Sequence, residues 1–376
     1  MKYSIDRILN ILSAVKDPET GKNLVSLNAI GSLSSEENKI TFSLSLPKTN
    51  PFVKSIEKAC VKLLKSELSE NVEVEIKSSP KIDVMKVSFG RTDDRQILPG
   101  VKNILAVASG KGGVGKSTVS VNLAISLAKQ GAKVGLLDAD VYGPSIPKML
   151  GVEGETPGIK KMNGKDVIIP IEKHGIKMLS IGFFVKPEDA LIWRGAMATS
   201  AINQFVKDTD WGELDYFIMD LPPGTGDIHL TIVQAMPVTA AVIVSTPQQV
   251  ALADALRGVG MFRAEKIEVP IIGFIENMSW FTPKELPDKK YYIFGKDGLK
   301  ELAERMEIPL LGQIPLVQGI RESGDSGTPL ALDDNSPEGK AFRSLAKNIA
   351  EKIEERNANL EPTKKVEIDP NASCGA

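Results

Sequence analysis

The fold is decided by the stretch Ile104-Leu105-Ala106-Val107-Ala108-Ser109-Gly110-Lys111-Gly112-Gly113-Val114-Gly115-Lys116-Ser117-Thr118. An apolar run comes first, then a loop with the pattern G-x-x-x-x-G-K-S/T, and then a helical run from Val119 to Ala128. A strand, a glycine-rich loop and a helix in this order are the setting that a phosphate-binding loop requires. The alternative is a glycine-rich turn with a chance lysine, which would require neither the helix nor the acidic residues that follow downstream.

The chemistry of this loop follows from its residue types. Glycines allow backbone N–H groups to turn inward and approach phosphate oxygens, and the next helix directs its positive end at the same place. Lys116 is expected to contact the β- and γ-phosphates, and the Ser117 hydroxyl to ligate Mg²⁺. The sequence therefore predicts an ATP and Mg²⁺ site whose nucleotide-binding residues are Gly110, Lys111, Gly112, Gly113, Val114, Gly115, Lys116, Ser117 and Thr118.

Short apolar runs alternate with helical patterns from Val101 onward. Strands that are apolar on both faces are typical of a parallel sheet covered by helices. They predict one doubly wound, mostly parallel α/β domain over residues 101–356, which a helix from Pro337 to Glu355 closes. The runs are Ile104–Ala108, Lys133–Leu137, Lys177–Ile181, Tyr216–Met219, Ala240–Val244, Ile271–Ile275 and Leu310–Ile314.

The residues before this domain predict a small α+β unit over 1–78. Two helices are expected, one from Ile5 to Val15 and one from Pro51 to Leu68. Three strands are expected at Leu24–Leu33, Lys39–Leu46 and Val72–Ile76. Residues 79–100 show no clear period and are interpreted as a linker, and the polar residues 357–376 as a flexible C-terminal tail.

Composition excludes several other classes of protein. The 376 residues are 42% hydrophobic and 25% charged with a formal net charge of −2, so no basic field favours nucleic acid or an anionic membrane. The N-terminus resembles no signal peptide, and no apolar run approaches the roughly 18–20 residues that cross a bilayer. We expect a cytoplasmic protein with no nucleic-acid or membrane partner.

Two more strands end in acidic residues. Asp138 and Asp140 follow the run that ends at Leu137, and Asp220 follows the run that ends at Met219. The carboxyl ends of parallel strands meet at one edge of a sheet, where α/β sites form. Asp138 is expected near Mg²⁺, Asp140 could orient the attacking water, and Asp220 is expected to hold the Mg²⁺ shell. A helix cap or a turn acid is the alternative for Asp138 and Asp140.

The segment after Asp220, Leu221-Pro222-Pro223-Gly224-Thr225-Gly226-Asp227, is typical of a switch loop. The Gly224 N–H could reach the γ-phosphate and move upon hydrolysis, whereas a simple turn is the alternative. His174 and His229 are single and lack ligand spacing, so both are interpreted as structural or surface residues, although His229 lies close to this segment.

The signature KGGVGKST resembles the deviant P-loop of the nitrogenase iron protein, the MinD and ParA ATPases, the arsenite-pump ATPase and the Mrp/ApbC proteins. In that class the extra lysine reaches across a homodimer to the partner's nucleotide. For Lys111 the resemblance implies a nucleotide-sandwich homodimer, with a solvated surface lysine as the alternative. The resemblance also assigns catalysis to Asp140, beside Lys111 and Lys116, and places Asn277 at the adenine edge. The Asn277 amide has a donor and an acceptor that suit a purine, whereas a turn-forming asparagine is the alternative.

Four further stretches resemble the Mrp/ApbC family of iron–sulfur cluster carriers, and the N-terminal unit resembles a domain of iron–sulfur assembly factors. They are Asp138–Ser145, Ile192–Gly195, Asp220–Asp227 and Glu276–Ser279. The resemblance covers about 350 of the 376 residues. It implies an ATP-hydrolysing carrier that works with iron–sulfur acceptor or scaffold proteins.

The chain departs from the family in its cysteines. Members that bind a bridging cluster carry Cys-x-x-Cys shortly after the E-N-M-S segment, whereas residues 279–292 here contain no cysteine. Cys374 lies about 17 residues past the last helix, and a flexible chain of that length spans roughly 20–25 Å. Cys374 is therefore a tentative ligand of a 4Fe–4S cluster bridging a dimer, with an ordinary exposed thiol as the alternative. Cys60 follows a helical apolar pattern and is interpreted as a core residue.

Three functions remain open on this reading. The first is an ATP-driven iron–sulfur cluster carrier or assembly factor. The second is an ATPase of the same family that acts as a scaffold or regulator without a cluster, which the missing Cys-x-x-Cys favours. The third is a positioning ATPase like MinD or ParA, against which the acidic, polar C-terminus EIDPNASCGA argues, because a membrane-binding MinD ends in a basic amphipathic helix.

Overall fold

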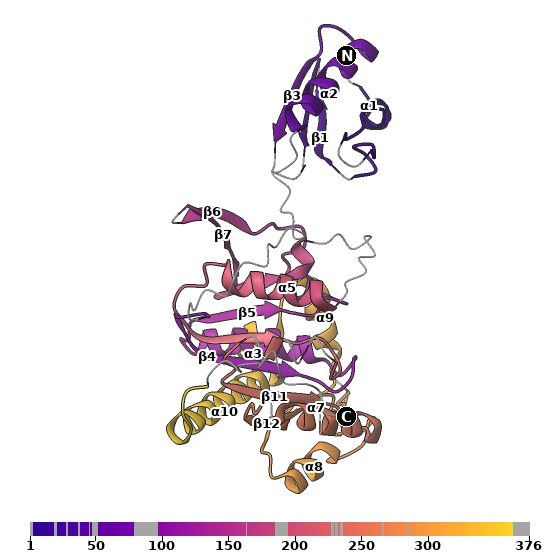
Figure 1. Cartoon of the computed structure of the whole chain (residues 1–376). Coiled ribbons are helices and arrows are strands. Elements are labelled where there is room, and N and C mark those ends of the chain that lie inside the picture. Colours follow the sequence, from indigo (N-terminus) through magenta and orange to yellow (C-terminus); the bar gives the residue numbers. More distant parts are fainter. Residues whose placement is uncertain are drawn as a thin grey trace, which may run out of the picture. The chain divides into compact units, whose positions relative to one another are not determined.

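The computed structural model describes residues 3–18, 21–27, 29–36, 38–44, 46, 52–78, 97–162, 164–184, 195–226, 229, 232–233, 236–264, 267–283, 285–286 and 288–363 (Figure 1). The chain divides into two compact units, Met1–Gly90 and Arg91–Ala376. No helix among the described residues is both long enough and apolar enough to cross a membrane. The predicted linker at 79–100 falls mostly outside the described residues, and the predicted tail continues outside them from residue 364.

The N-terminal unit is a three-stranded sheet with two helices. Its elements are α1 (Ile5–Leu12), β1 (Ile30–Glu36), β2 (Lys39–Leu44), α2 (Val53–Glu67) and β3 (Glu73–Ser78). The strand order is β1-β2-β3, with β1 antiparallel and β3 parallel to β2. Alternate residues of β2, Ile40, Phe42 and Leu44, are buried against the helices, together with Cys60 of α2. Cys60 is therefore a core residue, as its helical apolar pattern predicts.

The first predicted strand of this unit is wrong at its start. Leu24–Leu33 was expected to be extended, but β1 begins only at Ile30. The Asn23 side chain accepts a hydrogen bond from the Ser26 N–H at 2.7 Å, and the Leu27 N–H donates to the Asn23 carbonyl at 3.0 Å. An asparagine that caps its own turn in this way competes with strand formation. Leu24 is still fully buried, so its apolar character reflects the core rather than a strand.

The C-terminal unit is built on a sheet in which eight strands are described. Its strands are β4 (Val101–Ala108), β5 (Val134–Asp138), β8 (Ile171–Lys173), β9 (Ile176–Ser180), β10 (Leu214–Asp220), β11 (Ala240–Ser245), β12 (Ile271–Glu276) and β13 (Leu310–Gln313). They lie in the order β13-β12-β11-β4-β10-β5-β9-β8, and only the edge strand β8 is antiparallel to its neighbour. The seven predicted runs are the seven parallel strands, which confirms the doubly wound α/β fold.

Helices cover both faces of this sheet (Figure 1). The helices are α3 (Lys116–Lys129), α4 (Ile146–Met149), α5 (Gly195–Lys207), α7 (Gln249–Arg263), α8 (Gly298–Met306), α9 (Gln318–Ser326) and α10 (Pro337–Asn359). On one face, α3 and α10 pack with Leu105, Val107 and Val242 in one apolar core. On the other face, Ile243 packs against Gly258 of α7. The Phe217 ring contacts Trp211, and the Trp211 indole N–H donates to the Phe205 carbonyl of α5.

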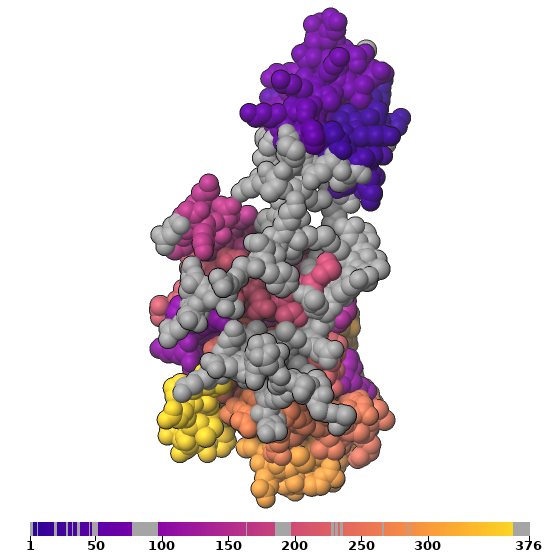
Figure 2. Space-filling model, viewed as in Figure 1, coloured from indigo at the N-terminus to yellow at the C-terminus, as the bar shows by residue number. Residues whose placement is uncertain are grey.

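A β-hairpin that the sequence analysis did not predict follows β5. It consists of β6 (Gly158–Met162) and β7 (Lys165–Ile169), and it extends from the body of the unit (Figures 1 and 2). Ile159 and Met162 are exposed on it whereas Ile168 is buried, so its apolar residues do not follow the clear alternation of a half-buried strand.

The chain order of the strands creates the position of the site. From β4 the chain continues to β5, which lies on one side of β4 with β10 between the two. After β10 the chain continues to β11, which lies on the other side of β4. Ligands of open α/β sheets bind at such a switch point, at the carboxyl ends of the strands. The glycine-rich loop between β4 and α3 lies at this edge.

Candidate functional site

The glycine-rich loop turns directly into α3. Gly115 precedes the helix with φ +81°, a left-handed conformation that glycine adopts without strain. A Cβ atom on Gly115 would lie 2.1 Å from Nδ2 of Asn277, so the loop also needs glycine for space. Gly110 is equally confined, because a Cβ there would lie 2.1 Å from the Asp254 carbonyl oxygen. The loop therefore has a single backbone path, fixed by α7 on one side and the end of β12 on the other.

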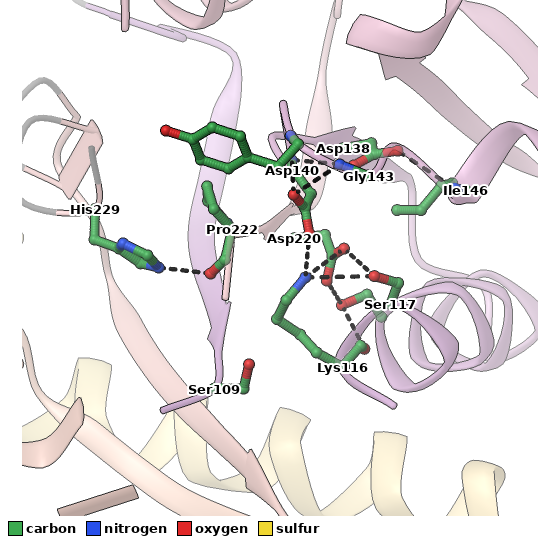
Figure 3. Close-up of polar contacts among 12 residues, drawn as sticks. Ser109, Lys116, Ser117, Asp138, Asp140, Gly143, Ile146, Asp220, Pro222 and His229 are labelled. Atoms are coloured by element: carbon green, nitrogen blue, oxygen red, sulfur yellow. Dashed lines mark hydrogen bonds and ion pairs between the residues drawn. The ribbon is translucent and has the colours of Figure 1, made fainter. Parts of the chain in front are cut away.

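Lys116 points into the acidic edge of the sheet (Figure 3). Its ammonium group is 2.8 Å from Oδ2 of Asp220 and 3.9 Å from Oδ2 of Asp140, and the residue is 5% exposed. The Ser117 hydroxyl donates to the same Asp220 oxygen at 2.6 Å. The predicted phosphate-binding lysine, the predicted Mg²⁺-ligating serine and the second acidic strand end thus meet at one point.

Sheet register brings the acidic residues together. Asp220 at the end of β10 pairs with Asp138 at the end of β5, which in turn pairs with Ser180 at the end of β9. Parallel strands align their carboxyl ends, so three polar side chains stand in a row at one edge. Asp220 is fully buried and accepts at its other oxygen, Oδ1, a 2.7 Å hydrogen bond from the Ser120 hydroxyl.

Asp138 is held from three directions. Ser180 donates its hydroxyl to Oδ2 at 2.9 Å, and the backbone N–H groups of Ile146 and Asp140 donate at 3.3 and 3.2 Å. Burial and the neighbouring charge of Asp220 raise the pKa of Asp138 to about 7, against the opposing effects of Ser180 and Lys116. Asp138 lies beside Asp220 and also accepts the N–H at the start of α4, as a capping acid does, while its place near Mg²⁺ stays a prediction.

Asp140 forms a turn with one oxygen and faces the loop lysine with the other. Oδ1 accepts the N–H groups of Tyr142 at 3.2 Å and Gly143 at 3.3 Å, while Oδ2 is the oxygen near Lys116. Burial raises the pKa of Asp140 and the charge of Lys116 opposes that rise. The turn fixes the carboxylate so that its second oxygen remains directed at the Lys116 ammonium (Figure 3).

The predicted switch segment is attached to the phosphate loop. The Gly224 N–H donates to the Ser109 carbonyl at 3.0 Å, and Gly224 has φ +95°. His229 is buried, with its Nε2 2.5 Å from the Pro222 carbonyl oxygen. Burial lowers the pKa of His229, so the ring is neutral and donates the Nε2 proton to this carbonyl. Of the two histidines interpreted as structural or surface residues, His229 is buried and its ring contacts the backbone of the switch segment at Pro222.

Asn277 is a contact of the phosphate loop. It is buried at the end of β12, and its side-chain amide donates to the Val114 carbonyl at 2.8 Å. Its amide nitrogen is thus engaged within the protein, and its amide oxygen has no hydrogen-bond donor among the described residues. Lys111 is half-buried, and its carbonyl accepts the Ser109 hydroxyl at 3.0 Å. A role of Lys111 across a dimer stays a prediction, since the structure holds one chain.

Cys60, the cysteine within the described residues, lacks the thiolate that a cluster ligand needs. Burial raises the pKa of the Cys60 thiol to about 12, so this sulfur is not a thiolate at neutral pH. Cys374 lies outside the described residues. Within those residues, no group of three or more His, Cys, Asp or Glu side chains could hold a metal ion.

Residues 279–292, where the resemblance would place a Cys-x-x-Cys, make a cation–π contact and backbone hydrogen bonds. Lys290 lies 3.8 Å from the centre of the Trp280 ring, and Phe281 and Tyr291 exchange two backbone hydrogen bonds of 2.8 Å. Leu316 donates its N–H to the Trp280 carbonyl at 2.7 Å. The described residues of this segment are therefore held by a cation–π contact and by backbone hydrogen bonds, one of them from Leu316.

The oxygen atoms gathered here fit a magnesium ion. Mg²⁺ takes one or two protein carboxylates and completes its shell with water and substrate phosphates, so it does not require three acidic ligands. Ser117 and Asp220 present a hydroxyl and a carboxylate oxygen within 2.6 Å of each other, with Asp138 on the adjacent strand.

The structure also reveals two residues that the sequence analysis missed, Ser120 and Ser180. Ser120 follows Ser117 by one helical turn, and that spacing could have identified it.

A glycine-rich loop between a central strand and a helix, facing aligned acidic strand ends, defines a P-loop NTPase. Residues 100–350 match the model of the NUBPL iron-transfer P-loop NTPase family, and residues 5–76 match that of an iron–sulfur cluster assembly protein. The chain therefore belongs to the NUBPL iron-transfer P-loop NTPase family, which confirms the resemblance drawn from its motifs.

Two relatives and one solved structure illustrate the match. The chain is 44% identical over 356 residues to the "Iron-sulfur cluster carrier protein" of Synechocystis, covering 93% of this chain and 97% of that protein. It is 47% identical over 272 residues to the "Iron-sulfur cluster transfer protein NUBPL" of Dictyostelium discoideum, covering 70% and 82%. A nucleotide-binding protein from Archaeoglobus fulgidus, solved with ADP, superposes with a TM-score of 0.56 at 36% identity, covering 65% of this chain and 93% of that one.

Proposed function

We propose that this protein binds and hydrolyses ATP and carries or assembles iron–sulfur clusters as a nucleotide-sandwich homodimer. The observation that carries the ATPase part is the meeting of Lys116, Ser117 and Asp220 within 2.6–2.8 Å at the phosphate loop. The carrier part is supported by relatives named as cluster carrier or transfer proteins, and by the assembly-type match of the N-terminal unit.

Each residue of the site has a role that its position supports. Backbone N–H groups of the loop bind the phosphates of ATP, and Lys116 leaves Asp220 to neutralise phosphate charge. Ser117 and Asp220, with Asp138 beside them, would hold Mg²⁺, which when bound neutralises the charge that develops between the phosphates. Asp140, held by its turn, orients the attacking water. Gly224 would release the Ser109 carbonyl and offer its N–H to the γ-phosphate, and Asn277 would contact the adenine through its amide oxygen.

The dimer and the cluster are proposed together. Lys111, at the start of the loop, would reach the nucleotide of the partner protomer and complete the charge around its phosphates. A 4Fe–4S cluster would bridge the two protomers, with the Cys374 thiolate of each protomer among its ligands, and would pass to acceptor proteins. Of the two cysteines in each chain, only Cys374 is a candidate, since Cys60 is fully buried with its pKa raised to about 12.

A second function is favoured by the same cysteine pattern. The segment at the position of the family's Cys-x-x-Cys contains none, and its aromatic contacts keep it folded. A chain of this kind could instead act as an ATP-dependent scaffold or regulator that binds partners through its N-terminal unit and holds no cluster.

Anaerobic reconstitution with iron and sulfide distinguishes these functions. We expect about four iron and four sulfide per dimer in the wild-type protein, the content of one 4Fe–4S cluster, and loss of both in Cys374→Ser. Retention in Cys374→Ser would reject Cys374 as a ligand but keep the carrier function. Absence of a cluster from the wild-type protein would reject the carrier function and favour the scaffold. ATP turnover of the same preparations tests the ATPase part separately.

A further inference from the structure

One hydroxyl of the site lies outside the phosphate-binding motif. Ser120 is in the second turn of α3 and is fully buried. Its Oγ is 2.7 Å from Oδ1 of Asp220 and 3.1 Å from the Lys116 carbonyl. The hydroxyl has one proton, and a carboxylate is the stronger acceptor at the shorter distance. The proton therefore points at Asp220.

The two oxygens of Asp220 have different partners. Oδ2 is shared by the Lys116 ammonium and the Ser117 hydroxyl, at 2.8 and 2.6 Å. Both of these groups also have a task toward the nucleotide in the proposed function, one at the phosphates and the other at Mg²⁺. Oδ1 contacts Ser120, whose side chain has no such task. When the nucleotide binds, the contacts at Oδ2 must change, whereas the contact at Oδ1 can persist.

The surroundings of Asp220 make a lasting anchor necessary. Asp138 is the register neighbour of Asp220 on β5, and Asp140 lies 3.9 Å from the same Lys116 ammonium, so three carboxylates that repel one another share this edge. Once Lys116 turns to the phosphates, that repulsion would favour rotation of the Asp220 carboxylate away from Asp138 and Asp140. A hydrogen bond from a buried helix residue opposes this rotation without adding charge.

We propose that Ser120 is a positioning residue that holds Asp220 by Oδ1, so that Oδ2 stays presented to the magnesium–nucleotide complex after Lys116 and Ser117 have exchanged partners. This inference rests on the proposed ATPase function and deepens it. Ser120 also joins the helix that follows the phosphate loop to the end of β10, because its hydroxyl spans the two elements.

The test measures ADP affinity by calorimetry over a range of Mg²⁺ concentrations, and in EDTA, for the wild-type protein and Ser120→Ala. Replacing a residue that orients a metal ligand lowers metal affinity roughly 10–100-fold. We expect the Mg²⁺ concentration for half-maximal enhancement of ADP binding to rise about 10-fold or more in Ser120→Ala. ADP affinity in EDTA should stay within about twofold, because the P-loop contacts that bind the phosphates are intact. Ser120→Thr, which keeps the hydroxyl, should restore the wild-type Mg²⁺ dependence.

Ser126→Ala is the matched control, since Ser126 is buried on the same helix but has no side-chain contact with the site among the described residues. Thermal melting of each variant checks folding. An unchanged Mg²⁺ half-point in Ser120→Ala, or an equal loss of ADP affinity with and without Mg²⁺, would overturn the proposal. A wild-type protein whose ADP binding ignores Mg²⁺ would instead reject the proposed function itself, so the two failures are distinguishable.

Discussion

Replacing Gly115 with alanine should destabilise the C-terminal unit through two separable effects. The first is backbone strain, because φ +81° costs an L-residue about 1–2 kcal/mol. The second is steric, because the new Cβ would lie 2.1 Å from the Asn277 amide nitrogen and displace its hydrogen bond to Val114. Leaving a buried carbonyl without its donor costs about 1–3 kcal/mol. We therefore expect a total of about 2–5 kcal/mol.

Gly113 provides a matched control in the same loop. It has φ +80°, but a Cβ there would meet nothing within 4 Å. Gly113→Ala should show the strain alone, so the two variants differ by the Asn277 contact, about 2 kcal/mol. In a domain of this size 1 kcal/mol shifts the melting temperature by roughly 2–4 °C, which gives a difference of roughly 4–8 °C. Thermal melting followed by circular dichroism measures it.

A double-mutant cycle identifies the cause of the difference. In an Asn277→Ala background the side chain that blocks the Cβ is absent, so Gly115→Ala should cost no more than Gly113→Ala. The coupling energy between positions 115 and 277 should be about 2 kcal/mol. Equal melting temperatures for Gly115→Ala and Gly113→Ala in the wild-type background would refute the reasoning.

Three further measurements test the site and the core. Lys116→Ala should lower ATP turnover at least about 100-fold, because the lysine that compensates the phosphate charge is removed. Lys111→Ala should keep ATP binding and lose hydrolysis. Normal turnover of the Lys111 variant would reject the role of this lysine across the dimer. Burial lowers the pKa of His229, so the unfolded ring protonates first as the pH falls through about 6.5, and stability that is complete above this pH declines below it. The charged groups that act on this ring are Lys116 and Asp140. The fall in melting temperature from pH 7.5 to 5.5 should be smaller in His229→Gln than in the wild-type protein. An equal fall in both proteins would show that His229 does not cause this pH dependence. Because burial raises the pKa of Cys60 to about 12, iodoacetamide should label it only after unfolding, as peptide mass spectrometry would show, and rapid labelling of the native protein would contradict its burial.

The sequence was sufficient to predict the parallel sheet because its strands are buried on both faces. Runs such as Ala240–Val244 are continuously apolar, a pattern that few other structures require. The meeting of Asp138 and Asp220 was predictable for the same reason, since parallel strands share a carboxyl edge.

Other features depend on contacts that no local pattern encodes. Whether Leu24 lies in a strand is decided by the turn at Asn23, and both alternatives bury the leucine. The hairpin β6–β7 exposes apolar residues, so alternation fails there. Ser180 was missed because its partner, Asp138, is 42 residues away in sequence and is reached only through sheet register.

The aromatic packing around Trp280 has a practical consequence for handling the protein. A segment whose shape depended on thiolate–iron bonds would unfold locally when oxygen destroyed the cluster. Here the segment is held by Lys290 over the indole ring and by the backbone pair Phe281–Tyr291, none of which is oxidised by air under ordinary conditions. Exposure of the purified protein to air should therefore leave the described residues of this segment and the nucleotide site beside them unchanged.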